Sequence, residues 1–154
     1  MTSKDGLKKP VCGVTAFILG LAVLMSFPGS AFAVECPQTR KTATAPQEFL
    51  TLQNPLPLND TALKAGENLF QNRAKPIACK FCHGTEGDGK SDPDFESSPP
   101  PRNFTCKETM GKLPDGQLFW VIKNGSKNTS MFAFSGLSDN QIWQLVHYVR
   151  SLGK

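Results

Sequence analysis

Residues 84–113 form a long stretch with neither helical nor strand periodicity, in a chain of only 154 residues. Glycine and proline interrupt it repeatedly, at Gly84, Gly87, Gly89, Pro93, Pro99, Pro100, Pro101 and Gly111. Loops longer than about 12–15 residues without secondary structure are uncommon in small domains. A chain of this length supports one domain rather than two. We therefore expect the stretch to surround a large apolar group that takes the place of missing protein core.

The motif directly before this stretch carries the chemistry. Residues 79–83 read Cys-Lys-Phe-Cys-His, a C-x-x-C-H pattern that is typical of covalent haem attachment. Two thiols three residues apart can add to the two vinyl groups of one porphyrin, and the next residue then places an imidazole below the iron. We predict one covalent haem c, bonded to Cys79 and Cys82, with His83 as an axial ligand of the iron.

Three other readings of this motif explain less of it. A zinc site needs four ligands, and no second Cys/His pair stands at ligand spacing. A thioredoxin-like C-x-x-C motif belongs in a βαβ context, which the chain lacks. A disulfide between Cys79 and Cys82 would give His83 no role.

Three residues could supply the second axial ligand of the iron: Met110, Met131 and His147. His147 falls on the polar face of a predicted helix, so we interpret it as a solvated side chain. Met110 lies in the irregular stretch. Met131 lies in residues 128–134, a short extended segment that can lay a thioether against a flat macrocycle. Any methionine can instead fill a core, but we favour Met131 as the ligand.

Apolar side chains recur at helical spacing in three segments, which we expect to be the helices of the domain. The first begins at Asn59 or Asp60 and ends before Pro76, the second covers residues 115–124, and the third covers residues 139–152. Residues suited to begin or end these helices stand at their boundaries: Asn59, Gly125, and the pair Ser138 and Gln141. No segment alternates as a strand would, and the predicted fold class is all-α.

With these motifs in view, residues 59–154 resemble a class I cytochrome c. The similarity is greatest to the single-haem bacterial type that includes c6-like and oxidase-associated cytochrome domains. Besides the haem motif, it rests on Gly-Glu-Asn-Leu-Phe at 66–70, on Met131, and on residues 137–152. The resemblance implies crossed first and last helices around one covalent haem, and it carries much of the support for Met131.

The resemblance also implies two specific contacts. The helices would cross where Gly66 and Phe70 meet Leu145 and Tyr148, which agrees with the cost of about 1 kcal/mol that a glycine inside a helix otherwise carries. A proline carbonyl after the haem motif would accept a hydrogen bond from the axial histidine, and the candidates are Pro100 and Pro101. Such a bond fixes the orientation of the ring.

Residues 1–33 have the features of a secretory signal peptide. Positive residues come first, an apolar run covers residues 11–27, and Ala-Phe-Ala at 31–33 is a cleavage site. The alternative is an uncleaved membrane anchor, for which the run is short. We expect cleavage near Val34 and a soluble periplasmic protein with no membrane span. Prolines make residues 34–58 an irregular N-terminal arm without a core of its own, followed by the cytochrome domain at 59–154.

Two cysteines remain outside the haem motif and the signal peptide. Two free thiols in an exported protein are less common than one disulfide. We therefore predict a bridge between Cys36 and Cys106 that ties the arm to the irregular stretch. The alternative is that each thiol is free or bonded to another chain.

Together these features predict an electron-transfer protein rather than an enzyme. With His83 and Met131 both on the iron, no position remains for a substrate, and the partners are redox proteins that donate and accept electrons. The protein would act as a monomer, or alternatively as a haem-bearing subunit of a larger periplasmic oxidoreductase. A ligand-binding five-coordinate haem would require that Met131 does not bind. The net charge of +4, part of it in the signal peptide, is too weak to indicate nucleic acid.

Overall fold

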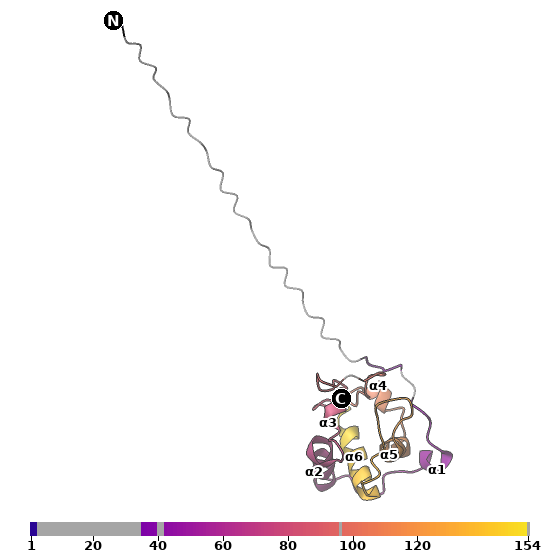
Figure 1. Ribbon diagram of the computed structural model, residues 1–154. Helices are drawn as coiled ribbons and strands as arrows, with labels where there is room; N and C mark the ends of the chain where they lie inside the picture. Colours follow the sequence, from indigo (N-terminus) through magenta and orange to yellow (C-terminus); the bar gives the residue numbers. More distant parts are fainter. Residues whose placement is uncertain (3–34, 40–41, 96, 154) are drawn as a thin grey trace. The chain divides into compact units, whose positions relative to one another are not determined.

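The computed structural model describes residues 1–2, 35–39, 42–95 and 97–153 (Figure 1). The chain divides into two units, residues 1–31 and 32–154, and the account below concerns the second. The predicted signal peptide lies outside the described residues apart from Met1 and Thr2. None of the helices in the described part of the chain is long and apolar enough to span a bilayer.

The described residues of this unit fold into helices and irregular segments and contain no strand, which confirms the all-α prediction. The elements are α1 (Gln47–Leu50), α2 (Asp60–Asn68), the π-helical turn η1 (Leu69–Arg73), α3 (Lys80–His83), α4 (Lys107–Met110), α5 (Asp115–Asn124) and α6 (Asp139–Ser151). The three longest agree closely with the predicted helices. Single-turn helices such as α3 and α4 were not predicted, because one turn is too short to show an apolar period.

The first and last long helices cross against one another, and Figure 1 shows α2 and α6 side by side. Gly66 faces Gln144 and Tyr148 at the crossing. The rings of Phe70 and Tyr148 pack with their centroids 5.3 Å apart. The most completely buried side chains belong to this contact and its surroundings: Phe70, Ile142, Leu145 and Val146. The core of the domain therefore lies along the inner face of α6.

Side-chain caps set where these helices begin. The side chain of Asn59 accepts a hydrogen bond from the backbone N–H of Ala62 at 2.9 Å, which satisfies one donor that a helix start leaves open. Ser138 and Gln141 form a capping box at the start of α6. At the other end of α5, Gly125 adopts a φ of 75°, a conformation that favours glycine.

The segment before α2 contributes more than the irregular arm that the sequence predicted. It contains α1, and Phe49 of α1 stacks on Phe119 of α5 with ring centroids 6.3 Å apart. A Cβ atom at Gly116 would overlap the carbonyl oxygen of Phe49, so the two backbones touch. α1 begins directly after Pro46 and has only one turn, which is too short to show an apolar period in the sequence.

Candidate haem-binding site

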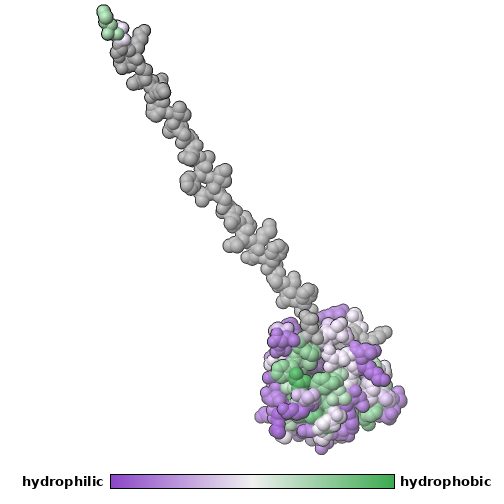
Figure 2. Space-filling model, viewed as in Figure 1, coloured by the Kyte–Doolittle hydropathy of each residue, from purple (hydrophilic) through white to green (hydrophobic). Residues whose placement is uncertain are grey.

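An open, largely apolar pocket lies among α3, α5, α6 and the irregular segments between them. Its empty volume is about 1120 Å³, including the part open to solvent. Figure 2 shows apolar residues gathered on the visible face of the domain. Residues from the long irregular stretch, including Phe95 and Phe104, form part of the wall. That stretch therefore forms part of the wall of a cavity, and near its end Met110 also joins the core.

The two motif cysteines project from one helical turn. Cys79 caps α3 and has helical dihedral angles, and Cys82 follows within the same turn. Residues three apart in a helix lie on one face, so both thiols face the same side, and both line the pocket. The turn ends at Gly84, which has a φ of 79°.

Burial keeps both thiols in the neutral form. It raises the pKa of Cys79 to about 12, because the protein around the sulfur cannot solvate a thiolate. Burial also raises the pKa of Cys82. Reactive redox cysteines have lowered pKa values and partly exposed thiolates. The pair therefore does not have the electrostatic setting of a dithiol redox centre.

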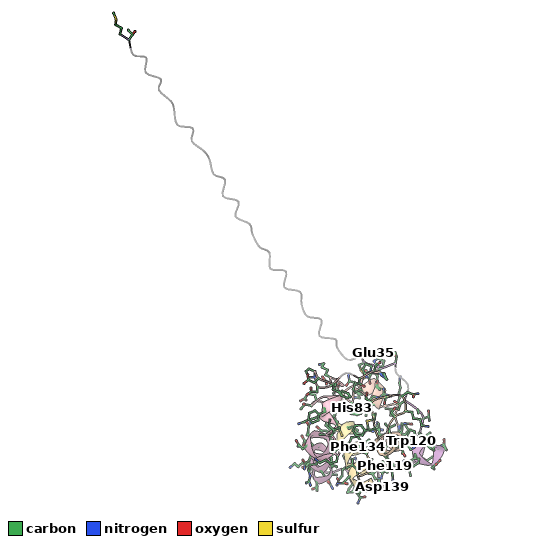
Figure 3. All side chains as sticks on the ribbon, in the orientation of Figure 1. Glu35, His83, Phe119, Trp120, Phe134 and Asp139 are labelled. Atoms are coloured by element: carbon green, nitrogen blue, oxygen red, sulfur yellow. A yellow bond between two sulfur atoms is a disulfide. The ribbon has the colours of Figure 1, made fainter. Side chains whose placement is uncertain are left out.

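The ring of His83 is held from two sides. Its Nδ1 atom lies 3.0 Å from the backbone carbonyl oxygen of Arg102, and the ring stacks on Phe104 with centroids 4.5 Å apart. A carbonyl oxygen only accepts, so Nδ1 carries the proton and Nε2 carries the lone pair that ligates a metal. His83 and Phe134, both labelled in Figure 3, line the pocket.

The acceptor for His83 differs from the sequence expectation of Pro100 or Pro101. The carbonyl oxygen of Pro101 instead accepts a hydrogen bond at 3.0 Å from the side chain of Gln38. The run of three prolines made the acceptor hard to predict from the sequence. Each proline offers a carbonyl oxygen and no N–H, so nothing distinguishes one carbonyl of the run from the next. The true acceptor, Arg102, is the first residue after the run.

Met131 lines the same pocket as the motif residues. Its segment is fastened to the end of α5, because Ser126 donates to the carbonyl oxygen of Met131 at 2.8 Å and Phe134 donates to that of Ile122 at 3.0 Å. A Cβ atom at Gly125 would lie 2.8 Å from the Met131 carbonyl oxygen. Glycine at this position therefore serves both the end of α5 and the close approach of the methionine segment.

The two other candidate ligands lie elsewhere. Met110 is 3% exposed and belongs to the core cluster. His147 is not the solvated side chain that the sequence predicted: it is partly buried, and its Nε2 atom lies 2.9 Å from the carbonyl oxygen of Leu56. The segment before α2 crosses the expected polar face of α6, which no pattern within α6 could reveal.

Sequence reasoning missed the polar part of the pocket wall, which includes Thr42, Arg102 and Gln117. Gln117 is buried in α5, and its side chain donates to Ala43 at 3.0 Å and accepts from Ala45 at 2.8 Å. A glutamine at a core position of an apolar helix could have indicated this contact, since a buried polar side chain needs a hydrogen-bond partner. The N-terminal arm supplies the partners of Gln117.

Cys36 and Cys106 are joined by a disulfide, with their Cα atoms 5.6 Å apart. The arm is thereby linked to the loop that contains the acceptor for His83. Glu108 lies beside the two sulfur atoms, but cysteines in a disulfide are not thiolate ligands, so the three residues do not form a metal site.

The residues of the pocket fit a covalently bound haem. Two neutral thiols on one face of a turn, an imidazole with Nε2 as its ligand atom, and a thioether share one apolar cavity. Imidazole and thioether are ligands that haem iron takes in electron-transfer proteins. The crossed helices and this site define a class I c-type cytochrome domain.

Comparison with known proteins gives the family. Residues 61–149 match the family described as "Cytochrome C oxidase, cbb3-type, subunit III", and the chain belongs to it. The domain is thus a haem-binding electron-transfer domain. No curated protein matches the chain.

The solved structures that are similar to this chain include a chain of the Kuenenia stuttgartiensis reducing HAO-like protein complex Kustc0457/Kustc0458. It shares 28% identity at a TM-score of 0.53, and the match covers 68% of this chain and 49% of that chain. This chain therefore spans about half the length of the solved chain it matches.

Proposed function

We propose that the protein is a periplasmic one-electron carrier with a single covalent haem, attached at Cys79 and Cys82 and ligated by His83 and Met131. The observation that supports this most directly is that these four side chains line one apolar pocket. Neither Met110 nor His147 belongs to that lining.

The haem, when bound, supplies a reversible one-electron change at its iron. The chain supplies the environment. The hydrogen bond from Nδ1 to the Arg102 carbonyl orients the His83 ring toward the metal. The thioether of Met131 would be the second ligand of the haem iron, where it would raise the reduction potential and leave no position for a substrate. The largely apolar walls would limit the water near a bound haem, so little would have to rearrange when the charge of the iron changes.

Absorption spectra of the matured protein, oxidised and reduced, test this assignment. A low-spin spectrum with the far-red methionine–iron band, unchanged by carbon monoxide, is the expected result. Met131→Ala should lose that band and bind carbon monoxide. Met110→Leu is the matched control, because it replaces a core methionine at similar volume and should keep the wild-type spectrum. A wild-type spectrum that is high-spin and shifts with carbon monoxide would instead support a five-coordinate ligand-binding haem.

The periplasmic location is supported by the bond between Cys36 and Cys106, because disulfides persist in oxidising compartments. It also rests on the signal features of residues 1–33. N-terminal sequencing of the protein from the periplasmic fraction should find a start near Val34. Recovery of the intact chain from membranes would favour an uncleaved anchor.

A haem-bearing subunit of a larger periplasmic oxidoreductase is the second candidate. Two observations favour it: the family is described as an oxidase subunit, and the similar solved chain belongs to a protein complex. Size-exclusion chromatography of the protein from its native source distinguishes the two. Elution at the size of the single chain supports the free carrier, and co-elution with a stoichiometric partner supports the subunit.

A further inference from the structure

A side chain of the N-terminal arm bridges the loop that holds His83. The amide of Gln38 donates through Nε2 to the carbonyl oxygen of Pro101 at 3.0 Å. Its Oε1 accepts from the backbone N–H of Asn103 at 2.9 Å. The two bonds lie on either side of Arg102, so one amide fixes the peptide groups before and after that residue.

The second of these bonds acts on the acceptor for the histidine itself. The carbonyl of Arg102 and the N–H of Asn103 belong to one peptide group, which is planar and points them in opposite directions. Holding the N–H against Gln38 therefore aims the carbonyl at the Nδ1 atom of His83, 3.0 Å away. Hydrogen bonds in series also polarise one another, which makes this carbonyl a stronger acceptor.

Gln38 is itself held in place. Its backbone N–H donates to the hydroxyl of Thr109 at 3.1 Å. Two residues earlier, the disulfide ties Cys36 to Cys106 in the same loop region. The guanidinium of Arg102 donates to Thr42 at 2.8 Å, which brings the arm back to the loop a second time. Asn103, the donor to Gln38, is only 6% exposed, so little water competes for this contact.

We propose that Gln38 is a positioning residue for the axial ligand His83 and acts through the peptide group between Arg102 and Asn103. This inference rests on the proposed function, since it needs His83 on a haem iron. A firm bond to Nδ1 makes the imidazole a stronger donor to the metal. A stronger donor favours the oxidised iron, so loss of Gln38 raises the reduction potential.

The test compares Gln38→Met with Gln47→Met in the matured protein. Gln38→Met keeps the length of the side chain and removes the bonds to Pro101 and Asn103, together with a longer bond that Oε1 accepts from the Arg102 guanidinium at 3.4 Å. Gln47 lies on α1 in the same arm and is exposed, so it is the matched control. At a fixed solution potential, Gln38→Met should change the ratio of oxidised to reduced protein about threefold toward the reduced form, because Gln38 acts on the metal ligand only through an intervening peptide group. Gln47→Met should leave that ratio unchanged.

The second readout is the exchange of the His83 Nδ1 proton with solvent, followed by NMR in the reduced protein. Exchange should accelerate about tenfold in Gln38→Met, because the proton is held less firmly. Gln38→Glu keeps an oxygen for the Asn103 N–H and should exchange within about twofold of wild type. If Gln38→Met does not fold, Gln38→Ala removes the same side-chain bonds and should show the same acceleration. An exchange rate in Gln38→Ala equal to that of Gln47→Met contradicts the proposal.

The outcomes separate the two proposals. If the wild-type protein carries no low-spin haem, the proposed function fails. If it does, and Gln38→Met matches Gln47→Met in both potential and exchange, then the positioning role of Gln38 is wrong and the carrier function stands.

Discussion

Gly66 of α2 lies so close to Gln144 of α6 that a Cβ atom at position 66 would overlap the backbone carbonyl oxygen of Gln144. A carbonyl inside a helix cannot turn aside without loss of its own hydrogen bond, so this contact sets the separation of the two helices. Phe70 of η1, which continues α2, packs its ring against that of Tyr148 of α6 beside the crossing. The geometry of the crossing therefore depends on the absence of one carbon atom.

We expect Gly66→Ala to destabilise the protein by about 1–3 kcal/mol, the usual cost of overpacking. The helix propensity of alanine would by itself act in the opposite direction, so a loss isolates the steric term. Urea denaturation followed by circular dichroism measures it. Gly136→Ala is the control, because nothing lies within 4 Å of a Cβ atom there, and it should change stability by less than about 0.5 kcal/mol. Equal effects of the two variants would contradict this account.

Arg150 joins three elements at the end of α6. Its Nε atom pairs with Asp115 at the start of α5 at 2.8 Å. Its Nη atoms donate to the carbonyl oxygens of Met110, the last residue of α4, and of Leu113, which follows α4 in the chain. Hydrogen bonds that involve a charged group contribute about 1.5–3 kcal/mol each to stability, net of the bonds to water that they replace.

We therefore expect Arg150→Met to lower the free energy of unfolding by about 2–4 kcal/mol, since it leaves two carbonyl oxygens and a carboxylate without their donor. Lys123→Met removes a more exposed pair, the one with Asp139 at 2.7 Å. Such pairs contribute less than about 1 kcal/mol. Denaturant unfolding of both variants checks the difference, and a larger loss in Lys123→Met would overturn the assignment of Arg150 as the stabilising contact.

The comparison of sequence with structure shows where local patterns suffice. Apolar periodicity was enough to predict the bounds of α5 and α6. The capping box at the start of α6 could be predicted from the identity and spacing of Ser138 and Gln141. The crossing at Gly66 followed from the family resemblance and from the cost of an interior glycine. Each of these depends on residues within one helix or on one small residue where two helices touch.

Contacts between distant segments could not be predicted in the same way. The side chain of His147 is held by a hydrogen bond to the carbonyl oxygen of Leu56, 91 residues away in the chain. Arg102 became the partner of His83 because of the path of a proline-rich loop, and Gln117 holds an arm 74 residues earlier at Ala43. The apolar periodicity of one helix does not indicate which distant segment of the chain will contact that helix.

Counting thiols tests the covalent assignments together. Of the 5 cysteines, Cys12 would be lost with the signal peptide. The denatured, unreduced protein should then give no reaction with a thiol reagent, because the remaining cysteines are all bonded. After reduction of disulfides, only Cys36 and Cys106 should react, since thioether bonds to haem resist reduction. Labelling at Cys79 or Cys82 in haem-containing protein, located by peptide mass spectrometry, would contradict covalent attachment at both sites.

Prevention of haem attachment should loosen the whole domain. Cys79→Ala with Cys82→Ala leaves the apolar walls of the pocket facing water, and the long stretch at 84–113 has little core of its own. We expect loss of the near-ultraviolet circular dichroism signal and binding of a hydrophobic dye, which are the signs of lost side-chain packing. The double variant Cys36→Ser with Cys106→Ser keeps the haem and should keep the near-ultraviolet signal. Unchanged packing without haem would show that the pocket is stable by itself.

Removal of the disulfide should cost stability without changing the coordination of the haem. The bond links residues 70 positions apart, and closing a loop of this size in the unfolded chain is worth about 4 kcal/mol in the chain-entropy model. We expect Cys36→Ser with Cys106→Ser to lose about 2–4 kcal/mol in urea denaturation, because measured values fall at or below that limit. The low-spin spectrum should persist, since neither sulfur lines the haem pocket. A variant as stable as wild type would mean that the hydrogen bonds of Gln38 and Gln117 hold the arm to the domain without the covalent link.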